Sequence, residues 1–406
     1  MGGSHSRRRR VACSDRRDPK CAIALTRLYE DSLTSTNVLV VHSPATESET
    51  SVTVSRKSFL LGGLAVPAAA ILAACGSDSS GGTSASTASA GVAAQTTAEE
   101  ITVEHAFGTT TIPAGASRFT AVAWGNHDVA LALDVMPTGL SAQTWGVEDD
   151  SGMLEWTKQK VDELVAAGAA QPVLFDDTDG YDYEAIAATA PDVILAAYSG
   201  LSQEDYDTLS QIAPTVAYPG VPWGTKWREM IRLDSQAMGL GEQGDALITD
   251  LEQQIADAVG QYPQIAGKSA AFFYMSESDT STIGFYTTAD PRTAFMTDLG
   301  MTIPASVQTV SDADPETFYS DVSSENADQV ADVDVMIMYG EESDLATLQA
   351  DALVGTIPAI KNGAVAFVGN GTPLSASTNP GPLSIPWGIE EYVALIAAAA
   401  DKADAA

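Results

Sequence analysis

Histidine and cysteine, which often serve as catalytic bases, nucleophiles and metal ligands, are scarce in this sequence. It has 4 histidines and 3 cysteines in 406 residues. The motifs G-x-S-x-G, H-E-x-x-H and G-x-x-x-x-G-K-[ST], which mark nucleophile, zinc and phosphate sites, do not occur after residue 74. A direct metal site typically needs three or four clustered His, Asp, Glu or Cys ligands, and no such cluster is evident in the sequence. The sequence therefore favours binding over catalysis, with a secreted hydrolase or metal-dependent enzyme as the less favoured alternative.

Flat aromatic side chains are placed where a binding cleft would need them. Trp124 ends an apolar, strand-like run, and Trp145 and Trp223 follow shortly after two others. Loops at strand ends form the binding sites of parallel α/β sheets, so we expect these three indoles to line a cleft and contact the apolar faces of a ligand. Trp387 precedes the expected last helix and is a candidate to close the same cleft. The other two tryptophans lie in helical patterns and are expected to pack internally.

Arg292 is the most informative charged residue. Asp290-Pro291-Arg292 has the order of a helix N-cap and the first two helical residues, where the helix dipole disfavours a cation. A cation beside free backbone N–H groups would serve an anionic or oxygen-rich ligand. A salt bridge to one of the many carboxylates is the alternative. Tyr286 and Tyr339 are further candidate donors to the ligand.

The histidines contribute less. His127 begins an expected helix directly after a strand, in the string WGNHD, and is a candidate for ligand contact. His105 lies in an edge segment and is expected to be structural.

Alternating apolar runs and amphipathic stretches predict an α/β fold with mainly parallel sheets. The ranges of the first half are strands 119–124, 138–142, 173–175, 193–198 and 215–218, with helices 128–133, 153–167, 183–190 and 204–212. In the second half they are strands 269–275, 335–339 and 365–368, with helices 291–299, 344–348 and 390–400. Between the halves, apolar residues at spacing four, namely Leu247, Leu251, Ile255 and Val259, predict one helix of about 18 residues, or about 27 Å. We therefore expect an N-terminal lobe (101–240), an interlobe helix (241–262) and a C-terminal lobe (263–406).

Five strings in order around that helix suggest a family. They are ITVEHAFGTTTIP, LALDVMPTGL, DYEAIAATAPDVILA, YDTLSQIAPTVAYP and SSENADQVADVDVMIMYG. The chain from about residue 101 onward resembles the periplasmic substrate-binding proteins of ABC transporters for ferric siderophores, haem and cobalamin. The resemblance implies two lobes joined by a rigid helix, with the ligand in the cleft between them, and delivery of that ligand to a membrane permease. Iron would arrive already chelated, so no cofactor is expected, and a haem or cobalamin carrier is the alternative.

The same resemblance implies a docking role for two carboxylates. Glu184 and Glu325 each open a short expected helix, one in each half. In the family, an acidic residue on each lobe meets arginines of the permease. Simple capping of the helix by the carboxylate is the alternative interpretation.

A processing signal precedes these lobes. Arg56-Lys57 is followed by 17 uncharged, largely apolar residues up to Cys75, a length short for a membrane span. The string LAAC resembles the lipobox of bacterial lipoproteins, which implies a signal peptide (52–74), acylation of Cys75 and a Gly/Ser-rich tether (75–100). Residues 1–51 are interpreted as a gene-model extension or a disordered segment. The expected location is the extracytoplasmic face of the cell membrane.

Charge restricts the partners further. The formal charge is −34, which argues against nucleic acid because phosphate binding needs clustered Lys and Arg. Without the first 74 residues, 10 basic residues stand against 48 acidic ones, a charge of −38, and only four arginines remain. Such a body is poorly suited to a triply anionic catecholate, so a hydroxamate or mixed-donor siderophore is favoured. We expect a monomer.

Overall fold

The computed structural model describes residues 96–276 and 279–405. The expected signal peptide, Cys75, most of the tether and the N-terminal extension lie outside these residues. Within them, no helix combines the length and the apolar character needed to cross a bilayer.

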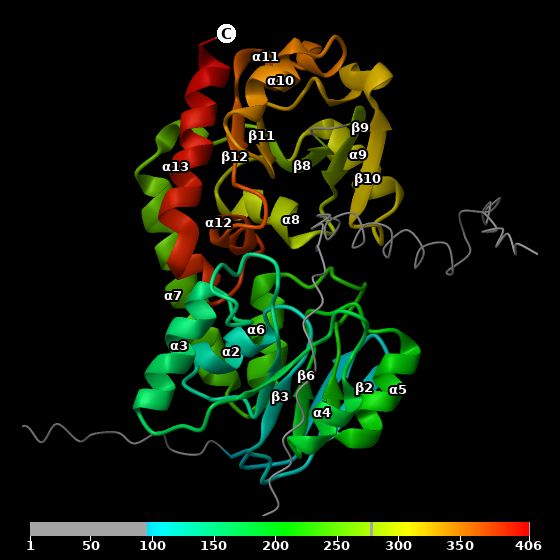
Figure 1. Ribbon diagram of the computed structural model, residues 1–406, viewed down its shortest axis with the longest axis vertical. Helices are drawn as coiled ribbons and strands as arrows, with labels where there is room; N and C mark the ends of the chain where they lie inside the picture. The colour runs from blue at the N-terminus through cyan, green and yellow to red at the C-terminus, as the bar shows by residue number, and fades with distance from the viewer. Residues whose placement is uncertain (1–95, 277–278, 406) are drawn as a thin grey trace, which may run out of the picture. The chain divides into compact units, whose positions relative to one another are not determined.

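The N-terminal half is built on a five-stranded, wholly parallel sheet in the order β5-β4-β3-β6-β7. Figure 1 labels its neighbouring strands β3 and β6. Continuous apolar runs form its inner strands because a parallel sheet with helices on both faces is buried on both sides. The strands are β3 (Phe119–Ala121), β4 (Gly139–Ser141), β5 (Val173–Phe175), β6 (Val193–Leu195) and β7 (Thr215–Val216). Each expected strand of this half is present, although all but β5 are shorter than expected.

Helices cover both faces of this sheet, as the alternation along β6 shows. Ile194 packs in one apolar cluster with Ile186 and Leu209, whereas Val193 and Leu195 belong to a second cluster on the other face. The helices are α2 (Asn126–Ala132), α3 (Glu155–Ala166), α4 (Tyr183–Ala188) and α5 (Gln203–Ile212). Helix α5 begins at a capping box made by Ser202 and Asp205, as the sequence predicts.

An antiparallel hairpin precedes the parallel sheet. It consists of β1 (Ile101–His105) and β2 (Gly108–Ile112). His105 is buried, and its Nε2 lies 2.8 Å from the hydroxyl of Thr110. These contacts are structural and fit the expectation for this histidine.

The C-terminal half has a mixed sheet in the order β10-β9-β8-β11-β12. Strands β8 (Ala270–Ser276), β11 (Val335–Met338) and β12 (Val365–Phe367) are parallel, as expected. Strands β9 (Asp279–Tyr286) and β10 (Tyr319–Ser323) were not predicted, and they pair antiparallel to their neighbours. Their polar and exposed residues hide the apolar alternation on which a strand prediction depends.

Short helices complete this half. They are α8 (Pro291–Asp298), α9 (Ala305–Ala313), α10 (Asp344–Ala350), α11 (Pro358–Asn362) and α12 (Pro373–Ser377), with the 3₁₀ segments η1 (Pro263–Ile265), η2 (Ser324–Val330) and η3 (Val354–Thr356). Helix α8 begins where the sequence predicts it, with Asp290 as its N-cap.

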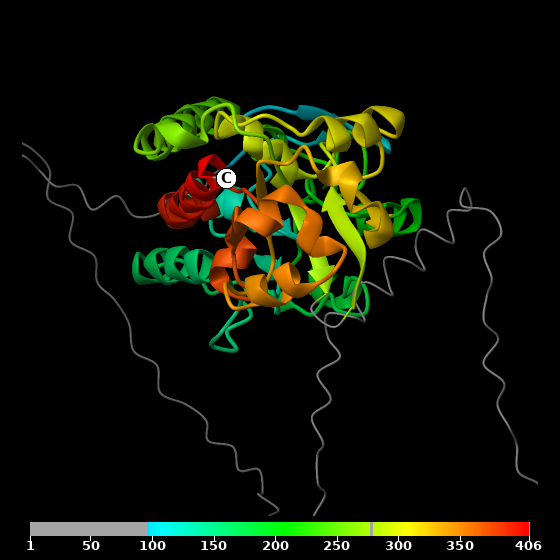
Figure 2. The ribbon, with the colours of Figure 1, turned by 90° about the horizontal axis from the view of Figure 1, so that it is seen from above.

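Three further helices connect and support the two sheets. They are α6 (Trp227–Ala237), α7 (Gly241–Gly260) and α13 (Ser384–Asp404). Helix α7 has 20 residues, so it spans about 30 Å. It packs against α6 and α13, and Figure 2 shows α13 (red) alongside it. The chain turns between α6 and α7 at Gly239, whose φ of 73° is accessible to glycine at little cost.

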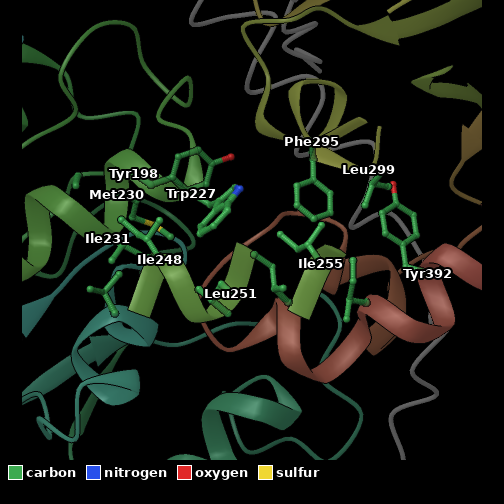
Figure 3. Close-up of a cluster of buried hydrophobic side chains, with 14 of the residues drawn as sticks. Tyr198, Trp227, Met230, Ile231, Ile248, Leu251, Ile255, Phe295, Leu299 and Tyr392 are labelled. Atoms are coloured by element: carbon green, nitrogen blue, oxygen red, sulfur yellow. The ribbon is translucent and has the colours of Figure 1, made fainter. Parts of the chain in front are cut away.

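One apolar cluster runs from the N-terminal half through α7 to the C-terminal half. Leu251 and Ile255 of the predicted stripe are buried in it, and Figure 3 shows Ile255 pointing toward Phe295 of α8. Leu247 and Val259 are partly buried against the same cluster. A helix packed along its length resists bending, so α7 acts as a stiff connection rather than a loose linker.

Candidate functional site

Two indoles that follow strands of the N-terminal sheet pack on each other, and one of them contacts a tyrosine that follows a strand of the C-terminal sheet. Trp124 follows β3 and Trp145 follows β4, and their ring centroids lie 6.2 Å apart. Trp145 also contacts Tyr339, which follows β11, edge to face at 5.3 Å. Both indoles are only partly buried. Side chains from strand ends in both halves therefore meet at this place.

Arg292 extends this aromatic group. Its Nη1 donates to the Tyr339 hydroxyl at 2.8 Å, and its guanidinium lies 3.7 Å from the ring centroid of Tyr286. A cation over an aromatic face is attracted by the ring quadrupole. The short helix α8 thus directs its one arginine back toward the end of the sheet.

Asp290 holds this guanidinium from the other side. Its two carboxylate oxygens accept from Arg292 Nε at 2.8 Å and from Nη2 at 2.6 Å. The Asp290 side chain is 1% exposed and the Arg292 side chain 16% exposed. Burial alone would lower the pKa of Arg292, but the charge of Asp290 holds that pKa well above its ordinary value. The salt bridge that the sequence left as an alternative is therefore present.

The ion pair leaves part of the arginine available. A guanidinium has about five N–H donors, and the described contacts use three of them. The remaining N–H groups are suited to oxygen acceptors of a ligand, while Asp290 balances the charge. The site thus offers hydrogen bonds without a net positive charge from this pair.

Tyr286 and Tyr339 are positioned by packing. Tyr286, the last residue of β9, is 1% exposed, and the guanidinium of Arg292 covers one face of its ring. Tyr339 is slightly more exposed, and its ring packs on Phe272 with centroids 4.7 Å apart. Of the two, Tyr339 is the better placed for a ligand because it borders Trp145.

Trp223 lies in the loop after β7, and its indole packs closely against Gly200. Its φ of 58° is unusual for a bulky residue, and its ring lies edge to face with Tyr198 at 5.4 Å. A Cβ at Gly200 would come within 2.2 Å of the indole, so this approach requires glycine. Tyr198 in turn accepts a hydrogen bond from Asn379 at 3.1 Å, which joins this loop to the C-terminal half.

Trp387 differs from its expected position. It lies inside the first turn of α13, which begins at Ser384 and not, as expected, near residue 390. Its partly buried indole packs on Trp156 with centroids 5.2 Å apart. Pro386 does not prevent this early start, because it falls in the first turn, where the missing N–H costs nothing.

His127 is poorly placed for a ligand. It is 0% exposed, and its Nε2 lies 3.4 Å from Asp128 and 3.5 Å from Thr157. Burial lowers its pKa, which favours the neutral ring. The sequence pattern placed the start of α2 correctly to within two residues but did not reveal that this turn faces inward.

Glu184 and Glu325 are both exposed. Glu184 lies in the first turn of α4, whereas Glu325 lies in the 3₁₀ segment η2, so the two helices are not of the same type. Another residue fills the cap in each case: Asp182 accepts from Ala185 N, and Ser323 accepts from Glu325 N. Capping is therefore performed by their neighbours.

Sequence reasoning missed several residues that build the site. Asn126 joins the ends of β3 and β6, since its amide donates to the carbonyls of Val122 and Tyr198 and accepts from the Tyr198 N–H. Its place directly after an apolar strand was the available signal. Asp290 was recognised only as a cap. No group of three or more His, Cys, Asp or Glu side chains suited to a metal occurs in the part of the chain that the structure describes.

Comparisons with known proteins agree with this architecture. Residues 121–370 match the family model described as periplasmic binding protein. The structure of Streptococcus pneumoniae TIGR4 PiaA in complex with ferrichrome is 45% identical and superimposes with a TM-score of 0.71, over 74% of this chain and 99% of that one. A periplasmic solute binding protein from Mycobacterium smegmatis is 25% identical with a TM-score of 0.59, over 74% of this chain and 99% of that one.

A more distant likeness concerns the fold alone. Staphylococcus aureus SirA complexed with staphyloferrin B is 20% identical with a TM-score of 0.55, over 75% of this chain and 98% of that one. No curated protein sequence matches the chain. With two α/β halves, a stiff connecting helix and a family match over more than half of its length, the chain belongs to the periplasmic binding protein family.

Proposed function

We propose that this chain is a lipid-anchored, extracytoplasmic solute-binding protein that captures a ferric siderophore and delivers it to an ABC permease. The observation that carries the proposal is the group formed by Trp124, Trp145, Tyr339 and Arg292, in which both halves contribute side chains. Its indoles fit the apolar surface of a chelate and its guanidinium fits the chelating oxygens. The 45% identity to PiaA, a structure solved with ferrichrome, supports the same class of ligand.

The charge balance at Arg292 favours a neutral chelate. A tris-hydroxamate complex of Fe(III), such as ferrichrome, has no net charge at its metal centre, whereas a tris-catecholate complex is triply anionic. Because Asp290 already balances Arg292, an anionic chelate would meet little compensating charge. Hydroxamate or mixed-donor chelates are therefore the preferred class. Iron enters as part of the ligand, and the protein performs no bond chemistry.

Three further side chains are weaker candidates for the ligand environment, namely Trp223, Tyr286 and Trp387. Trp223 and Trp387 are partly buried beside residues of both halves. Tyr286 contributes by supporting Arg292. We do not expect His127 to contact the ligand, because its ring is wholly buried.

Fluorescence titration tests the proposal directly. The protein is titrated with ferrichrome, a ferric tris-catecholate, haem and cobalamin under the same conditions. Saturable quenching by ferrichrome, with much weaker response to the catecholate, is the expected result. Tight binding of haem or cobalamin in its place would favour the alternative carrier, and no binding of any of the four would refute a ferrichrome-type hydroxamate chelate as the ligand.

The anchor has its own test. Cys75→Ala should remove lipid attachment and leave ligand affinity unchanged, because the thioether that carries the lipid forms at that sulfur. Metabolic labelling with a fatty acid, followed by fractionation, measures attachment. Recovery of a labelled Cys75→Ala protein in membranes would contradict the lipobox assignment.

A further inference from the structure

Lys226 connects the two halves directly beside the ion pair at Arg292. It is the N-cap residue of α6, and its Nζ donates to the backbone carbonyls of Thr288, at 2.8 Å, and of Ala289. These two carbonyls immediately precede Asp290, the residue that holds Arg292. A charged donor between consecutive carbonyls fixes the course of the backbone at that point.

Trp227 and Arg228, which follow Lys226, contact the C-terminal end of α8. Trp227 Nε1 donates to Asp298 at 2.9 Å, and Arg228 Nη1 donates to both carboxylate oxygens of Asp298 at 2.9 and 3.0 Å. Arg228 also pairs with Glu252 of α7 at 2.6 Å. Three consecutive residues thus contact α8 at its start and at its end. We call residues 226–228 the α8 clamp.

The Lys226 ammonium is unusual for a lysine. It is partly buried, and its described contacts are neutral carbonyls. Burial lowers its pKa to about 8, although the nearby charges of Asp290 and Glu229 act in the opposite direction. Burial deprives the ammonium group of hydration, which is unfavourable unless its hydrogen bonds to the two carbonyls compensate.

We propose that Lys226 is a positioning residue that sets the Arg292 guanidinium for ligand, acting through the Thr288–Ala289 backbone and Asp290. This inference rests on the proposed function. Lys226 reaches across from the N-terminal half, so the orientation of Arg292 depends on the register between the halves. The remaining N–H groups of Arg292 face the ligand only while this contact persists.

A double-mutant cycle with ferrichrome as the probe tests the inference. Lys226→Met keeps the apolar stem and removes the donors, and should weaken binding about 10-fold, as for loss of a charged hydrogen bond. Lys226→Arg should restore most of the affinity. In an Arg292→Ala background, Lys226→Met should change the affinity less than about 2-fold, because the residue it positions is gone. Lys268→Met, which removes a surface pair with Asp404, is the matched control and should bind as the wild type does.

The outcomes separate the two proposals. Unchanged affinity of Lys226→Met, or an equal loss in the Arg292→Ala background, overturns the positioning role while ferrichrome binding by the wild type stands. Absence of ferrichrome binding by the wild type overturns both. Should Lys226→Met fail to fold, Lys226→Gln replaces it in the same cycle and is judged by the same two criteria.

Discussion

The two sheets contribute different chemistry to the site. The N-terminal sheet is wholly parallel, and its strand-end loops carry the indoles Trp124, Trp145 and Trp223. The C-terminal sheet has antiparallel strands on one side, and there Tyr286 at the end of β9 supports Arg292 of α8. One half thus offers apolar faces and the other offers hydrogen-bond donors. In the function proposed above, recognition of the ligand is therefore divided between the two lobes.

Each half also carries one exposed carboxylate, Glu184 or Glu325, that is proposed to serve permease docking and not ligand capture. Replacing Glu184 and Glu325 together by alanine should abolish ferric siderophore uptake, because both carboxylates are exposed and are proposed to meet the permease. Ligand affinity in solution should be unchanged. Uptake of radioactive iron by cells and fluorescence titration of the purified protein measure the two effects.

A matched pair of substitutions controls for loss of charge alone. Glu204→Ala with Glu342→Ala also removes one exposed carboxylate from each half. This control should transport normally. Normal uptake by a stable Glu184→Ala, Glu325→Ala protein would refute the docking role.

Loss of Arg292 tests the polar half of the comparison. Arg292→Ala should weaken ferrichrome binding by about 1.5 to 3 kcal/mol, the range for a hydrogen bond to a charged group. This corresponds to about 10- to 150-fold in the dissociation constant. Arg232→Ala, in which an exposed ion pair with Asp245 is lost, should have no effect. A large fall in melting temperature at unchanged affinity would show that Arg292 serves the ion pair and not the ligand.

Tryptophan fluorescence tests the apolar half. Ferric chelates absorb and quench nearby indoles, so replacing Trp124, Trp145 and Trp223 by Phe should remove most of the quench on ferrichrome binding. Among single variants, Trp145→Phe should reduce it most, because Trp145 borders Tyr339 of the other half. An unchanged quench in the triple variant would place these indoles outside the cleft.

The contact between the halves at Lys226 should make stability depend on pH. The pKa of Lys226 is about 8 in the folded protein and 10.5 in its ordinary state. The unfolded chain therefore binds more protons between these values, and this group makes folding more favourable as pH rises through that window. The unfolding free energy of the wild type, relative to that of Lys226→Met, should therefore increase from pH of about 7 to about 10. Urea unfolding at both pH values measures it, and a constant difference would contradict the lowered pKa.

Local sequence patterns were sufficient for much of the fold. Apolar runs predicted every strand of the N-terminal sheet, and spacing of four predicted the buried side of α7 at Leu251 and Ile255. The N-cap order Asp290-Pro291-Arg292 placed α8 correctly. These features depend on residues close together in the chain, so their physical causes, which are backbone periodicity and capping, are legible in the sequence.

Only the tertiary structure decided which side chains meet. Arg292 and Tyr339 are 47 residues apart, and Lys226 and Thr288 are 62 apart. The burial of His127, the inclusion of Trp387 in α13 and the antiparallel strands β9 and β10 likewise depend on what packs against them. A residue's own neighbours in sequence carry no information about partners that far away. The ion-pair partner of Arg292, Asp290, lies in the same local motif, whereas its contact with Tyr339 is settled by packing.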